Sequence, residues 1–440
     1  MNLTRKLKRP GLIAVRIALT AAAIHVGARQ GKALPMFARR YSLPCSTCHT
    51  SPPRLNETGY QFRANGFRMS SEEADDAKSK LVNYVGFRLQ PRYDVTRSSV
   101  ASNVTTKQDA RLFAAEGYFL YGPISKNFSS NVKITFWPEQ SNETELTERL
   151  EGTIRYRYGS DDNFVDLRAG VPHPHEGIGG SESYVASDTR PFIQELRTAN
   201  FNQDTFFTPF GFHQAGGSVG YYYKRTTVRA QVTTGIRVKL DKEGKLEPFG
   251  LKDPLITALP QGERGGPDFN LFFNQILHHQ AGNVSVYYYN GRSFLPRLDL
   301  LPQTAGGIPD VSTVPFFKNN FNRLAFYAGY PVNRVNFLYG LQRGRDTIGS
   351  GGRFSSLGQF GEVMVRVIND ISALGARYDW FDPARIKDEN EMTGLTAYMN
   401  LWLHRELRVT PEYQYVVQKN GPGQPNRVDN RFQLRLYWVR

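Results

Sequence analysis

The chain has 440 residues, a formal net charge of +15 and a negative mean hydropathy. Its basic residues are scattered among aromatic and acidic ones instead of forming a clustered basic face with a recognisable module, so we expect no nucleic-acid partner. From residue 83 to the end, no apolar run is long enough for a transmembrane helix.

Residues 1–33 are predicted to be a signal peptide. A positively charged start precedes an apolar stretch over 12–28, and the small residues at 31–33 offer a cleavage site. These 33 residues hold seven Lys or Arg and no acid, so the remaining chain carries a formal charge of +8. That moderate excess suits a lumen that favours anions.

The sequence Cys45-Ser46-Thr47-Cys48-His49 matches the C-x-x-C-H signature of c-type haem attachment. Two thiols at this spacing can each add to one vinyl group of a porphyrin, and the next histidine can turn under the ring as the proximal iron ligand. We therefore predict one covalently bound haem c on Cys45 and Cys48, with His49 as an axial ligand of the haem iron. Covalent attachment in bacteria takes place outside the cytoplasmic membrane, which agrees with a signal peptide.

Three other structures could use the same residues. A disulfide could join Cys45 and Cys48, but a large protein has little need of so tight a ring. A zinc site needs about four ligands, and the sequence has no second C-x-x-C. A thioredoxin-like redox pair would lie in a βαβ unit, and no such pattern surrounds the motif.

The distal haem ligand is predicted to be Met69. It lies twenty residues after His49, beyond a helical pattern and a turn at Gly66, and His/Met ligation is a common pair in electron-transfer haems. Simple core packing of Met69 is the alternative. Met36 is too near the motif to swing across the ring. The other methionines after the signal fall in the predicted barrel: Met364, Met392 and Met399.

Residues 34–82 form the predicted monohaem cytochrome c segment, which is mostly helical. A further helix start is expected at Ser70, with Glu73 at the capping-box position. About 49 residues rarely bury enough surface to enclose a haem. We therefore expect this segment to plug the following domain, at its periplasmic side or inside its lumen.

Residues 83–440 are predicted to form a β-barrel of about sixteen antiparallel strands, because sixteen runs alternate polar and apolar residues. The second run covers 110–121 and the seventh 226–240. Connections after even-numbered runs are mostly tight, whereas those after odd-numbered runs are mostly long, including 172–215, 241–267 and 344–357. This alternation is typical of a bacterial outer-membrane barrel with short periplasmic turns and long outer loops.

Histidines outside the motif show no complete ligand set. His173 and His175, with Glu176, could hold a metal in the long fifth connection, although solvated loop residues are the simpler interpretation. The remaining candidates are His213, His278 and His279, near predicted strand ends. No catalytic triad, P-loop or dinucleotide fingerprint is present.

In its organisation the chain after the signal resembles the fused monohaem c-type cytochrome–porins of the bacterial outer membrane, a group that includes those of iron-oxidising bacteria. The region from Leu34 through Met69 carries the specific part of the resemblance, and residues 377–383 with the terminal strand look like phosphate-selective porins. The resemblance implies an outer-membrane barrel in contact with lipid and one haem c.

Three functions are compatible with these features. The leading one is electron transfer between an extracellular donor or acceptor, with iron as a candidate, and a periplasmic electron carrier. The second is a diffusion porin in which the haem segment acts as a plug or redox-sensitive gate. The third is an enzyme, such as a peroxidase, that uses an open haem face. An occupied sixth position would favour electron transfer, since catalytic haems leave it open.

Overall fold

The computed structural model describes residues 35–51, 54–70, 84–111, 115–138, 146–171, 185–193, 215–234, 238–240, 246–248, 267–277, 282–296, 316–348, 353–368, 371–383, 385, 390–404 and 406–439. Several predictions fall outside these residues: the signal peptide, the helix start between Ser70 and Glu73, and the histidine candidates with Glu176. Within the described ranges, no helix is both long and apolar enough to cross a membrane.

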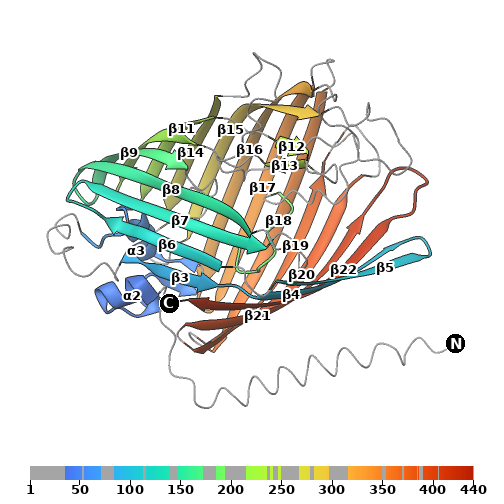
Figure 1. The fold of residues 1–440 in the computed structure, drawn as a ribbon, viewed down its shortest axis with the longest axis horizontal. Coiled ribbons are helices and arrows are strands. Elements are labelled where there is room, and N and C mark those ends of the chain that lie inside the picture. Colours follow the sequence, from blue (N-terminus) through green and yellow to red (C-terminus); the bar gives the residue numbers. More distant parts are fainter. Residues whose placement is uncertain are drawn as a thin grey trace.

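The dominant element is a closed antiparallel barrel of sixteen strands, as predicted (Figure 1). β3 (Gly86–Leu89) and β4 (Arg92–Val100) together form the first strand, because both pair with β22. β5 (Asn103–Arg111) and β6 (Ala115–Pro123) form the second, because β5 pairs with β4 and β6 with β3.

The other strands follow in chain order, each beside the next. They are β7 (Phe128–Pro138), β8 (Leu146–Gly159), β9 (Asn163–Val171), β10 (Gly216–Tyr223), β11 (Thr226–Thr233), β14 (Asp268–Ile276), β15 (Asn283–Pro296), β16 (Phe316–Val332), β17 (Val335–Ile348), β18 (Arg353–Ile368), β19 (Ser372–Asp382), β20 (Met392–His404), β21 (Leu407–Gln418) and β22 (Arg427–Val439). Pairing of β22 with β4, from Arg427 opposite Val100 to Arg435 opposite Arg92, closes the barrel. Closure leaves no strand edge unpaired.

Some strand limits differ from the prediction. β11 ends at Thr233, and Val238–Leu240 (β12) pairs instead with Leu246–Pro248 (β13) in a separate two-stranded sheet. β5 begins at Asn103, earlier than predicted, because its polar residues on both faces hide the period-two pattern. The connection predicted over 344–357 shrinks to 349–352, since β17 and β18 both extend past the alternating runs.

Side chains alternate between the two faces of the barrel wall. In β17, Phe337 and Tyr339 are exposed on the outside, whereas Asn336, Gln342 and Asp346 are buried on the inside. An apolar outer face with a polar inner face is the pattern of a lipid-embedded barrel.

Two tyrosine-rich runs contribute rings to both faces of the barrel wall. Tyr221 and Tyr223 lie on the exposed outer face, whereas Tyr287 and Tyr289 are buried inside the barrel. Adjacent residues of a strand point to opposite faces, so a run of tyrosines cannot lie wholly on the outside.

The N-terminal segment, which means residues 35–51 and 54–70, lies at one end of the barrel near the C-terminus, where Figure 1 shows α2 and α3. It contains α2 (Pro35–Tyr41), the short 3-10 helix η2 (Cys45–Thr47), a hairpin of β1 (His49–Ser51) and β2 (Arg54–Leu55), and α3 (Glu57–Ala64). Strands on this side are joined by tight turns such as Asn333–Arg334, and we call it the short-turn end.

Candidate functional site

The C-x-x-C-H motif occupies η2 and the start of β1. The Thr47 N–H donates to the Pro44 carbonyl (3.1 Å), which closes the turn. Cys48 is a half-buried free thiol, and burial raises its pKa above the ordinary value, so it stays protonated at neutral pH. His49 follows directly, half-buried, and pairs with Leu55 across the hairpin.

Asn56 ties this motif to helix α3. Its side-chain oxygen accepts from the Gly59 N–H (3.0 Å), so it is the N-cap of α3. Its side-chain nitrogen donates to the carbonyls of Ser46 (3.0 Å) and Thr47 (2.9 Å), and its backbone N–H donates to the Cys48 carbonyl (2.9 Å). One side chain therefore fixes both the helix start and the motif loop.

Gly59 allows α3 to approach the motif closely. A Cβ at this position would overlap the carbonyl oxygen of Cys48 and crowd the side chain of Leu55. Only glycine fits this contact between helix and loop.

We expect Asn56→Ala to loosen the motif from α3, because it removes a cap worth about 1 kcal/mol together with two loop hydrogen bonds. Hydrogen exchange of peptides from residues 35–70 should become faster, while the heat-modifiable gel migration of the folded barrel stays unchanged. Asn56→Asp is the matched control, since it keeps the cap but loses the side-chain donors. Slow exchange in both variants would contradict the dual role of Asn56.

An aromatic cluster anchors α2 and the end of the segment to the barrel wall. Met36, Phe62 and Phe67 pack with Tyr118 and Tyr121 of β6, and the rings of Phe67 and Tyr121 lie 5.2 Å apart. Met36 is 0% exposed within this cluster.

Met69 has a different environment. It is 40% exposed and follows Arg68, whose buried guanidinium donates to the carbonyls of Lys126 and Phe128 (3.2 Å) in and after the β6–β7 turn. The core-packing alternative for Met69 is therefore disfavoured. Met364 lies in β18, and Met392 and Met399 lie in β20, so all three lie in the barrel wall, as predicted.

The remaining contacts of the segment run around the short-turn end. At the C-terminus of α3, Arg155 of β8 donates to the carbonyls of Arg63 (2.9 Å) and Ala64 (2.6 Å). At the start of α3, Glu57 forms an ion pair with Arg225 in the β10–β11 turn (2.6 Å). These bonds fix both ends of the helix to the wall.

The β1–β2 hairpin and Tyr60 of α3 contact the other side of the same end. Tyr60 and Leu55 pack on Ile276 at the end of β14. Arg54 donates to the Phe337 carbonyl of β17 (3.3 Å), and Arg366 of β18 donates to the Thr50 carbonyl (3.0 Å). The segment thus reaches from β6 to β18 across the short-turn end.

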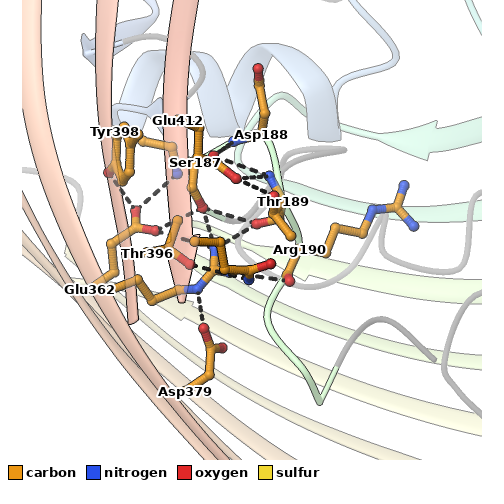
Figure 2. A network of polar contacts seen from close by, with 12 residues as sticks. Ser187, Asp188, Thr189, Arg190, Glu362, Asp379, Thr396, Tyr398 and Glu412 are labelled. Carbon is orange, nitrogen blue, oxygen red and sulfur yellow. Dashed lines mark hydrogen bonds and ion pairs between the residues drawn. The ribbon is translucent and has the colours of Figure 1, made fainter. Parts of the chain in front are cut away.

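A second insert lies inside the lumen. Residues 185–193, here called the lumen segment, belong to the long connection between β9 and β10 and bond to polar side chains of β18, β19 and β21 (Figure 2). The Ala186 N–H donates to Glu362 (2.9 Å), the Asp188 N–H to Glu412 (2.7 Å), and the Phe192 N–H to Asp379 (3.2 Å).

Arg377 joins this network from β19. It is fully buried, forms an ion pair with Asp379 (2.7 Å), and donates to the carbonyls of Thr189 (2.6 Å) and Arg190 (3.2 Å). The apolar side chains of the lumen segment pack on the aromatic inner wall: Val185, Phe192 and Ile193 join Tyr287, Tyr289, Phe321, Tyr327, Phe360 and Phe381.

Both inserts form hydrogen bonds with the same strand, β18. On the inner face of this strand, Arg366 contacts the N-terminal segment at Thr50, and Glu362 contacts the lumen segment at Ala186. Met364 lies between these two residues of β18 and packs on Ala186. Between them the two inserts contact the wall from β6 through β18 to β22, where the Tyr437 hydroxyl donates to Asp188 (2.6 Å).

The sequence shows the C-x-x-C-H motif but does not identify the residues that hold it in place. Asn56 and Gly59 look like ordinary helix-start residues, and Arg155 and Arg366 look like ordinary lumen charges. One sequence signal could have indicated Asn56. It is a polar residue seven positions after the C-x-x-C-H histidine and lies directly before a helical run. Among the described residues, no group of three or more His, Cys, Asp and Glu side chains is arranged to hold a metal ion.

Comparison with known proteins identifies the fold. No protein-family model and no curated protein matches the chain. Among solved structures, Pseudomonas putida OprB matches with a TM-score of 0.52 and 10% identity, covering 84% of this chain and 97% of that one. OmpT of Vibrio cholerae matches at 0.48 and 11%, covering 81% and 97%, and an anion-selective porin from Comamonas acidovorans at 0.45 and 11%, covering 81% and 99%. At this identity the similarity to OprB concerns the fold alone, and that fold is a porin-like barrel.

Proposed function

We propose that this protein is an outer-membrane c-type cytochrome that transfers electrons between an extracellular donor or acceptor and a periplasmic carrier. The observation that carries the proposal is the complete C-x-x-C-H motif, which holds both cysteines of the chain, on a segment fixed across one end of a closed barrel. A diffusion channel has no need of two thiols and a histidine at this spacing.

Location in the outer membrane is supported by the barrel itself. Its strand number is even, its outer face is apolar and its inner face is polar, which are features of outer-membrane barrels. In such barrels the short turns lie in the periplasm. The N-terminal segment would then lie at the periplasmic mouth, within reach of a soluble carrier.

The residues of the motif suit a haem. Cys45 and Cys48 would form the two thioether bonds, and Cys48 is not used in a disulfide. His49 would be the proximal ligand and Met69, which is exposed, the distal one. Bound haem would supply one-electron exchange at its iron. Asn56 and Gly59 would hold the loop in place, so that little rearrangement accompanies a change of charge.

The barrel limits how an external partner reaches this site. A membrane with its headgroups is about 40 Å thick, and one haem cannot bridge that distance. A donor must therefore enter the lumen from the long-loop end, past the lumen segment. Small donors such as hydrated metal ions satisfy this condition better than proteins do.

We expect Met69→Ala to convert a low-spin haem into a high-spin one, because it removes the proposed sixth ligand. Visible spectra should lose the weak methionine-to-iron band near the red end, and carbon monoxide should bind to the reduced protein. Met392→Ala, in β20, serves as the control. An unchanged spectrum in Met69→Ala would assign the sixth position to another group.

A gated porin is the second candidate, and the lumen segment favours it, because the chain fills part of its own channel with a bonded insert. Liposomes with an internal electron acceptor separate the two functions. Electron transfer from an external donor, with little ion conductance, supports the cytochrome. Conductance that responds to reduction of the haem, without electron transfer, supports the gated porin.

A further inference from the structure

Arg54 is a buried cation with most of its hydrogen-bonding capacity unused. It lies in β2, five residues after His49, and is only 5% exposed. Its Nη1 donates to the Phe337 carbonyl (3.3 Å), whereas Nε and Nη2 are buried and make no hydrogen bond within the described part of the chain. Nε–H and Nη2–H form one edge of the guanidinium, and this edge can bind a carboxylate through two parallel hydrogen bonds.

The barrel wall leaves space for this side chain. A Cβ at Gly329 of β16 would overlap Nη2 of Arg54, so the glycine leaves room for the guanidinium against the wall. The same side chain lies near Tyr60, whose pKa burial raises to about 12 while Arg54 and Arg63 act in the opposite direction. Arg54 is therefore held in place by the fold.

A second arginine lies at the same hairpin. Arg366 donates to the carbonyls of Thr50 (3.0 Å) and Asn333, and its Nε is also buried without a hydrogen bond to described residues. In the described ranges no Asp or Glu forms an ion pair with Arg54 or Arg366. Two guanidinium groups thus flank the β1–β2 hairpin without a counter-charge from this part of the chain.

The charge of the whole N-terminal segment also favours an anionic ligand. Residues 35–70 contain five arginines and one acid, Glu57, which pairs with Arg225 of the wall. A buried cation without a partner is costly, and breaking a buried pair destabilises a fold strongly. An anionic group bound at this hairpin would remove that cost.

We propose that Arg54, supported by Arg366, forms a carboxylate-binding site whose ligand is a propionate of the haem attached at Cys45 and Cys48. The inference rests on the proposed function. A porphyrin carries its two propionates on the edge away from its two vinyl groups, so a haem fixed through its vinyls presents carboxylates at a distance from the thiols. A free carboxylate from solution has the same chemistry and is the other possible source.

The test compares the full-length holoprotein with Arg54→Gln by redox titration from about pH 5 to about pH 8. A propionate paired with a guanidinium stays ionised over this range, so the midpoint potential of the unaltered protein should be nearly flat. In Arg54→Gln the potential should be lower at high pH and should rise as the propionate takes up a proton. Arg54→Lys keeps the charge without the bidentate edge and should lie between the two.

Arg353→Gln is the matched control, because it removes the same charge from the far end of β18, the strand that carries Arg366. Its titration should coincide with that of the unaltered protein. If the midpoint potential of Arg54→Gln also equals that of the unaltered protein and depends on pH in the same way, the propionate site is overturned. If acetate at constant ionic strength shifts the potential of the unaltered protein but not of Arg54→Gln, the carboxylate site stands and its ligand is a free anion.

A haem-free arm separates this inference from the proposed function. In the chain with Cys45→Ala and Cys48→Ala, acetate should raise the thermal unfolding temperature, and the further change Arg54→Gln should abolish that rise. If the natural chain carries no haem, the proposed function fails, while a rise that depends on Arg54 still supports the carboxylate site. No haem and no effect of acetate would overturn both.

Discussion

Cys45→Ala with Cys48→Ala should eliminate covalent haem completely, because each thioether bond needs its own thiol and the chain holds no other cysteine. Haem staining of a denaturing gel should disappear, and the intact mass should fall by that of one haem. Each single substitution should leave at most one thioether bond, with a shifted spectrum and less attached haem.

Ser46→Ala is the control for this experiment, since it lies between the two cysteines and only its backbone carbonyl is used, by Asn56. It should retain full staining. Heat-modifiable migration of all variants should show the same folded barrel. Stained protein in the double variant would refute a haem c at this motif.

Arg377→Met should release the lumen segment. The substitution keeps the length of the side chain but leaves Asp379 and Glu362 buried without their cation and removes the bonds to Thr189 and Arg190. Breaking a buried ion pair in this way costs about 3–5 kcal/mol. Single-channel conductance should rise, and chymotrypsin should cut after Phe192 in the folded protein.

Arg323→Met provides the comparison. Arg323 of β16 is equally buried, lies three strands from β19, pairs with Asp346 of β17 (2.9 Å) and donates to the Arg345 carbonyl (3.0 Å). Its loss should destabilise the barrel by a similar amount without cleavage after Phe192 or a change in conductance. Equal conductance in both variants would show that the lumen segment does not obstruct the channel.

The strand number could be predicted from the sequence because a barrel wall imposes a period of two, and tight turns alternate with long connections between the runs. The alternation of polar and apolar residues is lost where both faces of a strand have the same surroundings, either water or protein. Residues 103–109 of β5 therefore show no period of two, and the alternation continues to Leu240 in the sequence although β12 pairs elsewhere.

In the candidate site, the residues that the sequence identifies differ clearly from those that only the folded structure identifies. Cys45, Cys48 and His49 are recognisable because bond chemistry fixes their spacing. The bonds from Arg155 to α3, from Arg366 to Thr50 and from Glu362 to Ala186 join residues far apart in the chain. No local pattern marks these partners, so the anchoring of either insert required the folded barrel.

Closure of the barrel through β4 and β22 has a consequence for assembly order. The wall residues that hold the N-terminal segment lie on strands β6 to β18, whereas the closing seam joins the first strand to the last. The segment can therefore dock on an open, growing sheet before the seam forms. A chain truncated after β18 should therefore still protect residues 35–70 from protease.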